Sequence, residues 1–413
     1  MTDTPLHLTS LPDRWRLVPF WTVAGEVTDR NVGLRERNLL SLSYGRVVRK
    51  NINSAEGLLP ESFDGYQIVE QGDTVLRLTD LQNDQRSLRT GFVQERGIIT
   101  SAYVVVRPKS IDQRFLAWLL HAYDSNKAFY ALGGGLRQGM RFADLKGLAV
   151  PLPPTEEQRR IADFLDDQVT RIDETVGLRR QQLGQVETLP ASISNVFLAQ
   201  CGNDGPPLSA LAGICDTAHK TAPGVPDGGY WIAGTSAVRA GRIVTRELRE
   251  TDESGFREWT ERATPSEGDL LLTREAPVGE VGLLEKGHAP IAIGQRVVLL
   301  QPGPNLSPRF LRLVLMSSTL GRLIADAVKG SLHPHLNMSD IRRLRIPECD
   351  PDEQRRLGGL HSDALDLVDE LRRALLGSSA LLVERKRSLI TAAVTGAFDV
   401  SSASVRAAEA VMA

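Results

Sequence analysis

A chain of 413 residues is longer than one ordinary hydrophobic core supports, so we expect two or three domains. Its 41% hydrophobic and 24% charged residues are typical of globular proteins, and no apolar run of about 18 residues argues for a membrane span. A formal net charge of −2 excludes a basic nucleic-acid coat, so any DNA contact depends on local basic clusters or on a partner.

The N-terminus and the cysteines indicate the compartment. The first residues show no basic segment followed by an apolar one, so they do not resemble a secretory signal, and we expect the chain in the cytoplasm. Cys201, Cys215 and Cys349 are odd in number and form no C-x-x-C pair, which favours neither a disulfide framework nor a zinc site. We expect them to be reduced and structural.

In chain order, two blocks of short β-like runs each precede a helical segment. The first block has a strand-like run at 103–108 and a helix expected at 114–123, followed by a junction where Thr155 is the expected N-cap of a long helix. The second block has strand-like runs at 268–273 and 295–302 and a helix expected at 308–328. Asp350 is then the expected N-cap of a second long helix, with Pro351 at the first helical position.

The two junctions are copies of each other. VPLPPTEEQRRIADFL (150–165) reappears as RIPECDPDEQRRLGGL (345–360), and Pro347 lies 196 positions after Pro151. The same offset relates Asp144 to Asp340, and both fit helix or turn caps better than catalytic acids. A period near 200 residues is too long for a solenoid, so it indicates duplication of a domain together with the helix that follows.

Apolar residues recur at heptad spacing after each junction. An amphipathic helix packed on its own domain explains one such stripe, but two copies at equivalent positions favour pairing of the two helices, each about 40 residues or 60 Å long. Arg179, Pro190, Gly377, Ser378 and Arg385 interrupt the seams, where we expect kinks or local unpacking. The seam residues are Leu165, Ile172, Val186, Ile193, Val169, Val176, Leu183 and Phe197 in the first helix and Val368, Leu371, Leu375, Leu382 and Leu389 in the second.

With these junctions, LPDRWRLVPF near the start and LLVERKRSLITAAVTGAFDV near the end, the whole chain resembles the specificity subunit of a type I DNA restriction-modification system. The resemblance implies an α+β fold with a pseudo-twofold internal repeat: two similar globular α/β target recognition domains separated by two long antiparallel coiled-coil helices. The expected parts are recognition domain 1 at 1–152, a central spacer helix at 153–200, recognition domain 2 at 201–348, a C-terminal spacer helix at 349–400 and a disordered tail at 401–413.

The resemblance also implies a non-catalytic subunit that reads a bipartite target in double-stranded DNA. Two methyltransferase subunits and restriction (motor-nuclease) subunits are the implied partners; they bind S-adenosylmethionine and ATP with Mg²⁺, while this chain binds no cofactor. Basic clusters and the donor-rich loops before the junctions supply the DNA-binding candidates, since Arg suits guanine and Asn or Gln suits adenine. These are Arg46, Arg49, Lys50, Arg86, Arg89, Arg137, Gln138, Arg141, Arg274, Lys329, His333, His335 and Asn337.

The long helices are the surface on which the resemblance places the methyltransferase subunits. The candidates for that docking lie in the two junctions and near the C-terminus: Glu157, Gln158, Arg159, Glu353, Gln354, Arg355, Arg385 and Phe398.

Other functions have weaker support. The prolines at 151–154 lack the residues that flank an amino-methyltransferase motif, and the glycines at 133–135 lack the Gly-Lys-Ser/Thr ending of a phosphate-binding loop. His333 and His335 have no nearby acid or cysteine, so we expect no metal. Two rivals stay open: an enzyme with its own nuclease or methyltransferase site, and a coiled-coil assembly scaffold whose recognition domains are degenerate.

Overall fold

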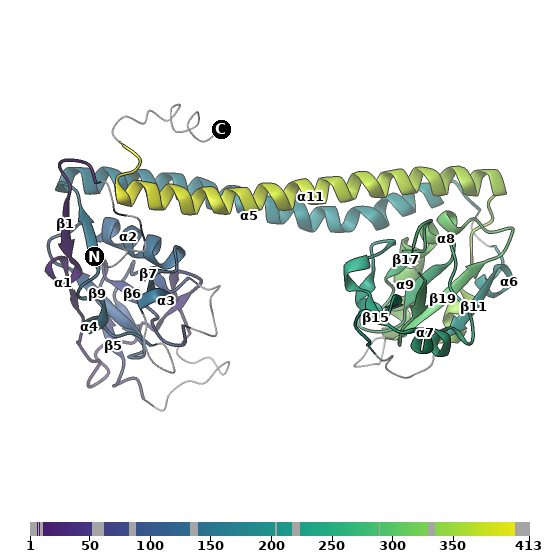
Figure 1. Ribbon diagram of the computed structural model, residues 1–413, viewed down its shortest axis with the longest axis horizontal. Helices are drawn as coiled ribbons and strands as arrows, with labels where there is room; N and C mark the ends of the chain where they lie inside the picture. The colour runs from purple at the N-terminus through teal and green to yellow at the C-terminus, as the bar shows by residue number, and fades with distance from the viewer. Residues whose placement is uncertain are drawn as a thin grey trace. The chain divides into compact units, whose positions relative to one another are not determined.

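The computed structural model describes residues 6, 8, 11–51, 62–81, 88–132, 139–202, 205–216, 224–288, 290–328 and 335–400, with backbone alone for 131–132 and 326–328. The tail expected at 401–413 therefore lies outside the described residues. The chain divides into two units, each of which contains part of both long helices (Figure 1). Unit 1 comprises residues 1–178 and 378–413, and unit 2 comprises residues 179–377.

Unit 1 is built on an antiparallel sheet of four strands in the order β2-β9-β6-β7. Three two-stranded sheets, β1-β10, β3-β4 and β5-β8, complete its strands. The elements are β1 (Arg16–Pro19), α1 (Phe20–Val23), β2 (Ala24–Glu26), β3 (Leu40–Ser43), β4 (Arg46–Arg49), β5 (Gln67–Val69), β6 (Thr74–Leu76), β7 (Thr90–Phe92), β8 (Gly97–Ile99), β9 (Val104–Pro108), α2 (Gln113–Ser125), α3 (Ala128–Leu132), α4 (Phe142–Leu145) and β10 (Ala149–Leu152).

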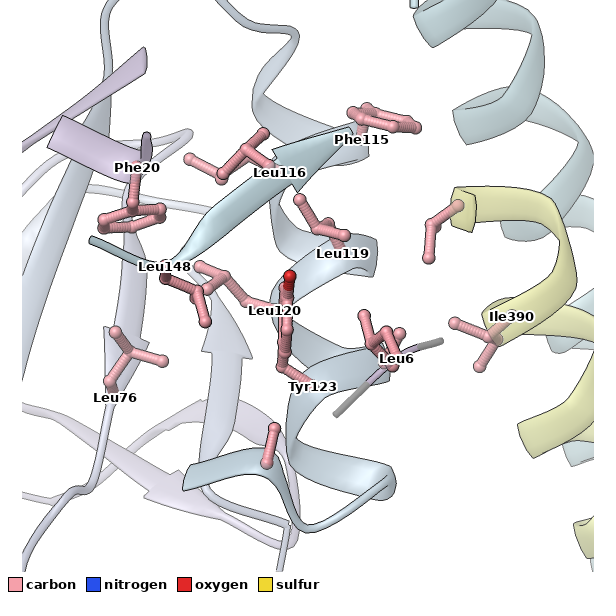
Figure 2. Close-up of a cluster of buried hydrophobic side chains, with 14 of the residues drawn as sticks. Leu6, Phe20, Leu76, Phe115, Leu116, Leu119, Leu120, Tyr123, Leu148 and Ile390 are labelled. Atoms are coloured by element: carbon pink, nitrogen blue, oxygen red, sulfur yellow. The ribbon is translucent and has the colours of Figure 1, made fainter. Parts of the chain in front are cut away.

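Helix α2 carries the largest core of unit 1. The carboxylate of Asp112 accepts hydrogen bonds from the backbone N–H groups of Arg114 and Phe115, which starts the helix. Its apolar face then buries Phe115, Leu116, Leu119, Leu120 and Tyr123. Figure 2 shows Ile390 of the C-terminal helix pointing toward the same cluster, so that helix belongs to the core of unit 1.

Unit 2 repeats the strand order of unit 1. Its four-stranded antiparallel sheet is β11-β19-β16-β17, again with the last strand of the sheet placed between the first and the second. It also has a sheet β15-β12-β18, in which β12 and β18 are parallel, and a pair β13-β14. The elements are α6 (Leu208–Leu211), β11 (Ala212–Asp216), β12 (Tyr230–Ala233), η1 (Thr235–Ala237), β13 (Val238–Arg239), β14 (Arg242–Ile243), η2 (Thr245–Glu247), β15 (Arg249–Thr251), α7 (Glu253–Thr260), β16 (Leu270–Thr273), β17 (Val281–Leu283), β18 (Ile291–Ile293), β19 (Val297–Pro302), α8 (Pro308–Leu315), α9 (Ser318–Val328) and α10 (Met338–Arg343).

The expected strands and helices are present, with one helix divided. β9, β16 and β19 lie within the strand-like runs, and α2 covers the helix expected at 114–123. The helix expected at 308–328 is instead two helices, α8 and α9, because the chain leaves helical geometry at Met316 and Ser317. The hydroxyl of Ser317 donates to the carbonyl of Val314 and accepts from the backbone N–H of Thr319. Ser317 thereby ends one helix and starts the next.

The two long helices are α5 (Thr155–Leu198) and α11 (Pro351–Thr395). Asp350 is confirmed as the cap of α11, since its carboxylate accepts from the backbone N–H of Asp352. The prediction for Thr155 was wrong by one residue: α5 begins at Thr155 itself, after Pro154, whose carbonyl accepts the first helical hydrogen bonds. α5 continues through Pro190, whose carbonyl accepts from the hydroxyl of Ser194.

Within each unit, segments of the two long helices lie side by side in opposite directions. In unit 1, Lys386 Nζ of α11 lies 2.7 Å from the carboxylate of Asp173 of α5, and the ring of Phe398, just after the end of α11, stacks on Phe164 of α5 with 5.6 Å between centroids. In unit 2, the hydroxyl of Ser194 is 2.9 Å from His361 Nε2, and both side chains are fully buried.

The division between the units crosses both helices where the heptad pattern is interrupted. It passes between Leu178 and Arg179 in α5 and between Gly377 and Ser378 in α11. The Nε atom of Arg179 is buried without a hydrogen bond, as an Arg placed on an apolar seam would be. Leu371, which the heptad spacing assigned to the seam, is 45% exposed and does not belong to it.

The repeated junction sequence has a repeated structural role. The side-chain carbonyl of Gln158 accepts from the backbone N–H of Asp112, the residue that caps α2, and its amide donates to the carbonyl of Pro153. In unit 2, Gln354 accepts from the backbone N–H of Ser307, which precedes α8, and donates to the carbonyl of Cys349. Each glutamine is buried and fastens the first turn of a long helix to the start of a domain helix.

Candidate nucleic-acid interface

One backbone contact places a loop at the same location in both units. The N–H of Met140 donates to the carbonyl of Leu78 at 2.9 Å in unit 1, and the N–H of Leu336 donates to the carbonyl of Arg274 at 3.1 Å in unit 2. The residues in these two bonds are related by the 196-residue offset of the sequence repeat. The segment before each junction is therefore tied in the same way to the end of a core strand, β6 or β16.

These loops present Arg141 and Asn337 at equivalent positions. Each residue precedes a short helix, α4 or α10, and each is exposed. The backbone N–H of Arg141 donates to the carboxylate of Asp144, and the amide of Asn337 donates to the carboxylate of Asp340. Asp144 is confirmed as a helix-capping residue, whereas Asp340 bonds the side chain of Asn337 and makes no capping bond to the backbone.

In unit 2, the fold brings three candidates together from distant parts of the sequence. Arg274 donates from its guanidinium to the carbonyl of Leu336 at 2.9 Å and forms an ion pair with Asp216 at 2.8 Å. The Leu336 bond fixes the segment that carries the exposed side chains of His335 and Asn337, which lie 3.1 Å apart. The side chain of Arg274 is 13% exposed, so it supports this loop and presents little of itself to a ligand.

In unit 1, Arg141 lies in a groove of about 420 Å³ that sequence reasoning missed. Arg30, Gln67, Ser101 and Tyr103 also line it. The amide of Gln67 donates to the carbonyl of Tyr103 at 2.8 Å, so the strand β5 and the turn before β9 form one wall. No sequence pattern signalled these residues, because they come from short strands and turns whose mutual positions only the folded chain defines.

The basic cluster around β4 is divided in the structure. Side chains alternate across a strand, so Arg46 and Arg49 lie on opposite faces of the β3-β4 hairpin. Arg46 is 75% exposed and lies 3.3 Å from Asp173 of α5, whereas Arg49 forms an ion pair with Glu95 that raises its pKa. Lys50 is exposed at the end of the hairpin. Arg46 and Lys50 remain candidates for phosphate contacts. The guanidinium of Arg49 is instead paired with the carboxylate of Glu95.

Arg89 does not contribute a surface for DNA. Its side chain is fully buried, and its guanidinium donates to the carbonyls of Thr79 and Asp80 and to the hydroxyl of Tyr130. We therefore correct its assignment: Arg89 is a structural residue of unit 1, because a buried charge needs such internal partners. Five candidates lie outside the described residues: Arg86, Arg137, Gln138, Lys329 and His333.

The docking candidates differ in how much surface they present. Gln158 and Gln354 are buried and hold the junctions, so they do not contact a partner directly. Arg159 and Arg355 are exposed at equivalent positions and pair with acids of their own helices, Glu156 and Asp352. The others are partly exposed: Glu157 accepts from the indole of Trp15, Glu353 pairs with Arg356, Arg385 is half-buried and Phe398 stacks on Phe164.

Within the described part of the chain, no helix is long and apolar enough to cross a membrane. Over the same residues, His, Cys, Asp and Glu side chains form no group of three or more that is suited to a metal ion.

Comparisons with known proteins agree on one family. The family model of the type I restriction modification DNA specificity domain matches residues 92–187. The MjaIX specificity subunit of a type I restriction enzyme from Methanocaldococcus jannaschii is 25% identical over 130 residues, which are 32% of this chain and 29% of that protein. The alignment thus spans less than a third of that relative's length.

Solved structures share the fold over most of the chain. A chain from a study of complex assembly and conformational transition of the type I R-M system aligns with a TM-score of 0.69 at 18% identity, over 93% of this chain and 98% of that one. The HsdS subunit from Thermoanaerobacter tengcongensis aligns with a TM-score of 0.54 at 19% identity, over 94% and 98% of the two chains. The α+β fold of this chain is therefore one that such subunits have.

Proposed function

From the similarity of this chain to type I restriction-modification specificity subunits, we propose that it is the non-catalytic subunit through which such a complex recognises a bipartite sequence in double-stranded DNA. Each unit contributes one target recognition domain, and each domain reads one half-site. The rival in which the chain carries its own methyltransferase or nuclease site has less support, since the relatives are specificity subunits.

The repeated loop attachment carries this proposal. Met140 and Leu336 make the same backbone bond to the end of a core strand, and they place Arg141 and Asn337 at equivalent surface positions. Arg can read guanine with two hydrogen bonds and Asn can read adenine in the same way. Two domains that share one architecture but present different side chains are suited to a DNA target whose two half-sites differ in sequence.

We further propose that α5 and α11 form an antiparallel coiled coil that spaces the two recognition domains, as part of a pseudo-twofold repeat. The antiparallel contacts inside each unit and the matching strand orders support this arrangement. A rigid spacer of this kind sets the distance between half-sites, because both domains must face the same side of the duplex.

The partners in the proposal are two methyltransferase subunits and restriction subunits, in the cytoplasm. S-adenosylmethionine and ATP with Mg²⁺ bind to those partners, and this chain binds neither. A net charge of −2 fits this division, since partners that clamp the duplex can provide most phosphate contacts. The exposed Arg159 and Arg355 offer the two methyltransferase copies equivalent contacts near the starts of α5 and α11.

The test is to co-express the chain with the methyltransferase encoded beside it and to map methylated adenines in genomic DNA by single-molecule sequencing. We expect a split motif with a fixed gap. Methylation without a sequence motif, or a stable complex that methylates nothing, would instead support the rival in which the chain is a coiled-coil scaffold with degenerate recognition domains.

A further inference from the structure

Two cysteines that are distant in sequence meet in unit 2. Cys201 follows the end of α5, and Cys349, which lies 148 positions later in the chain, comes just before the start of α11. The segments that carry them run antiparallel: the N–H of Gly202 donates to the carbonyl of Glu348 at 2.9 Å, and the N–H of Leu208 donates to the carbonyl of Leu344 at 2.8 Å. Gly202 directly follows Cys201 and Glu348 directly precedes Cys349, so the Gly202 bond sets the two cysteines opposite each other.

This backbone arrangement suits a disulfide. Opposed residues of antiparallel segments have Cα atoms about 4.5–5.5 Å apart, and that interval falls inside the range of about 4.4–6.8 Å that disulfides span. Both thiols are reduced in the structure, and both are half-buried. Closing the bond therefore needs little movement of the chain.

The surroundings of the two thiols differ. Cys349 lies just before the N-terminus of α11 and close enough to Arg356 for their charges to interact. Cys349 also lines a groove of about 470 Å³ on the surface of unit 2, which gives a small oxidant access to it.

Cys201 is held as a thiol. Burial, the neighbouring thiol of Cys349 and the nearby carboxylate of Glu353 raise the pKa of the Cys201 thiol to about 12. Arg356 also donates to the side chain of Gln200 at 3.0 Å, so it links the segment of Cys201 to α11. One thiol is therefore favoured as the attacking group, and the other as the group that completes the disulfide.

We propose that Cys349 and Cys201 form a redox-active dithiol site that a small disulfide such as oxidised glutathione converts into an intramolecular disulfide. The Cys349 thiolate attacks one glutathione sulfur, the glutathione S–S bond breaks and one glutathione thiolate leaves. Cys201 then gives up its proton and attacks the Cys349 sulfur of the mixed disulfide, which releases the second glutathione. Two protein thiols are oxidised, one glutathione disulfide is reduced, and the protons pass to the two leaving thiolates.

The bond closes a loop that contains every strand of unit 2. It joins the end of α5 to the start of α11, and cross-linking a long loop restricts the unfolded chain. In a reducing cytoplasm the pair stays open, and oxidant closes it reversibly. The oxidised protein should unfold at a higher temperature than the reduced protein.

The test incubates the purified full-length protein with oxidised glutathione, blocks remaining thiols with an alkylating agent and identifies cysteine peptides by mass spectrometry. We expect a peptide that links Cys201 to Cys349, reversal by dithiothreitol and an alkylated Cys215. Cys215 is an internal control because it is also half-buried and lies in β11. Separate glutathione adducts on Cys201 and Cys349 without a link, or linkage through Cys215, would overturn the proposal.

Four variants test the assigned roles. Cys201→Ser should accumulate glutathione on Cys349, whereas Cys349→Ser should leave Cys201 unmodified over the same time. Arg356→Gln should slow disulfide formation several-fold, because it removes the bond to Gln200 that links the segment of Cys201 to α11, and Arg356→Lys should recover part of the rate. Faster modification of Cys201 than of Cys349 would refute the roles, and the wild-type peptide map decides the proposal even where a variant folds poorly.

Discussion

Single buried polar residues connect the long helices to unit 2. His361 of α11 is fully buried against Ser194 of α5, and burial together with the charge of Arg312 lowers its pKa to about 3. The side chain of Arg312 is also buried, and its guanidinium is 3.6 Å from Glu285. A neutral imidazole is therefore part of the native packing between α5, α11 and the domain.

We predict that protonation of the unfolded chain at His361 destabilises unit 2 in acid. Between about pH 6.5 and pH 3 the unfolded chain binds a proton there that the folded chain does not, so the free energy of unfolding falls as the pH falls. The contribution at pH 5 is about 2 kcal/mol. Urea unfolding at several pH values in this range measures how the free energy of unfolding changes with pH. This change should be smaller for His361→Gln than for wild type, while His335→Gln, at an exposed site, keeps the wild-type pH dependence. The same pH dependence in all three proteins would contradict the prediction.

A second prediction concerns the equivalent loop residues. Under the proposed function, Arg141→Ala and Asn337→Ala should each relax recognition of one half-site and leave the other unchanged, because each lies in a different unit. The expected loss for a bidentate base contact is about 1–3 kcal/mol. Methylation rates of the complex on DNA with single base changes measure it. Arg257→Ala is the control, since Arg257 pairs with Glu253 of its own helix; a loss spread evenly over all sequences would indicate a phosphate contact instead.

At the scale of elements, the two junctions show why the chain repeats its sequence. A glutamine in the first turn of each long helix fastens it to the N-terminus of a domain helix, through Asp112 in unit 1 and Ser307 in unit 2. Only a side chain with both an acceptor and a donor can make these contacts and those to Pro153 and Cys349. The repeated motif therefore connects each long helix to its domain, in addition to any contacts that it makes with partners.

We predict that Gln354→Ala lowers the free energy of unfolding of the chain by about 1–3 kcal/mol, because it leaves the partly buried N–H of Ser307 without its acceptor. Gln354→Glu keeps that acceptor but, when ionised, loses the donor to the carbonyl of Cys349, so it should be less stable than wild type at neutral pH and should recover stability at a pH where its protonated carboxyl again donates. Chemical unfolding measures both. Gln181→Ala, at an exposed position of α5, should leave the free energy of unfolding unchanged. An unchanged free energy of unfolding in Gln354→Ala would contradict the structural role of this glutamine.

At the scale of the whole molecule, the proposed spacer predicts that the gap between the two DNA half-sites can be changed without changing the half-site sequences. Inserting one heptad into both helices, after Leu178 in α5 and after Gly377 in α11, keeps the antiparallel seam in register. Seven residues add about 10 Å along a helix, which is up to about three base pairs at about 3.4 Å each. Methylome mapping should show the same half-sites with a longer gap. Altered half-sites, or an unchanged gap, would argue against the spacer.

The sequence by itself determined the elements and their repetition. Heptad spacing, the capping residue Asp350 and the 196-residue offset depend on local pattern, and they predicted α5, α11 and the duplicated junctions. Family resemblance, confirmed by the match at residues 92–187, predicted the α+β fold.

The tertiary structure decided which side chains reach the surface. Arg89 and Arg141 look alike in sequence, yet one is enclosed by carbonyls of its own domain and the other borders an open groove. The same holds for the groove walls at Arg30 and Gln67 and for the contact of Cys201 with Cys349. Such placements depend on pairings between residues far apart in the chain, and a periodic pattern reports only near neighbours.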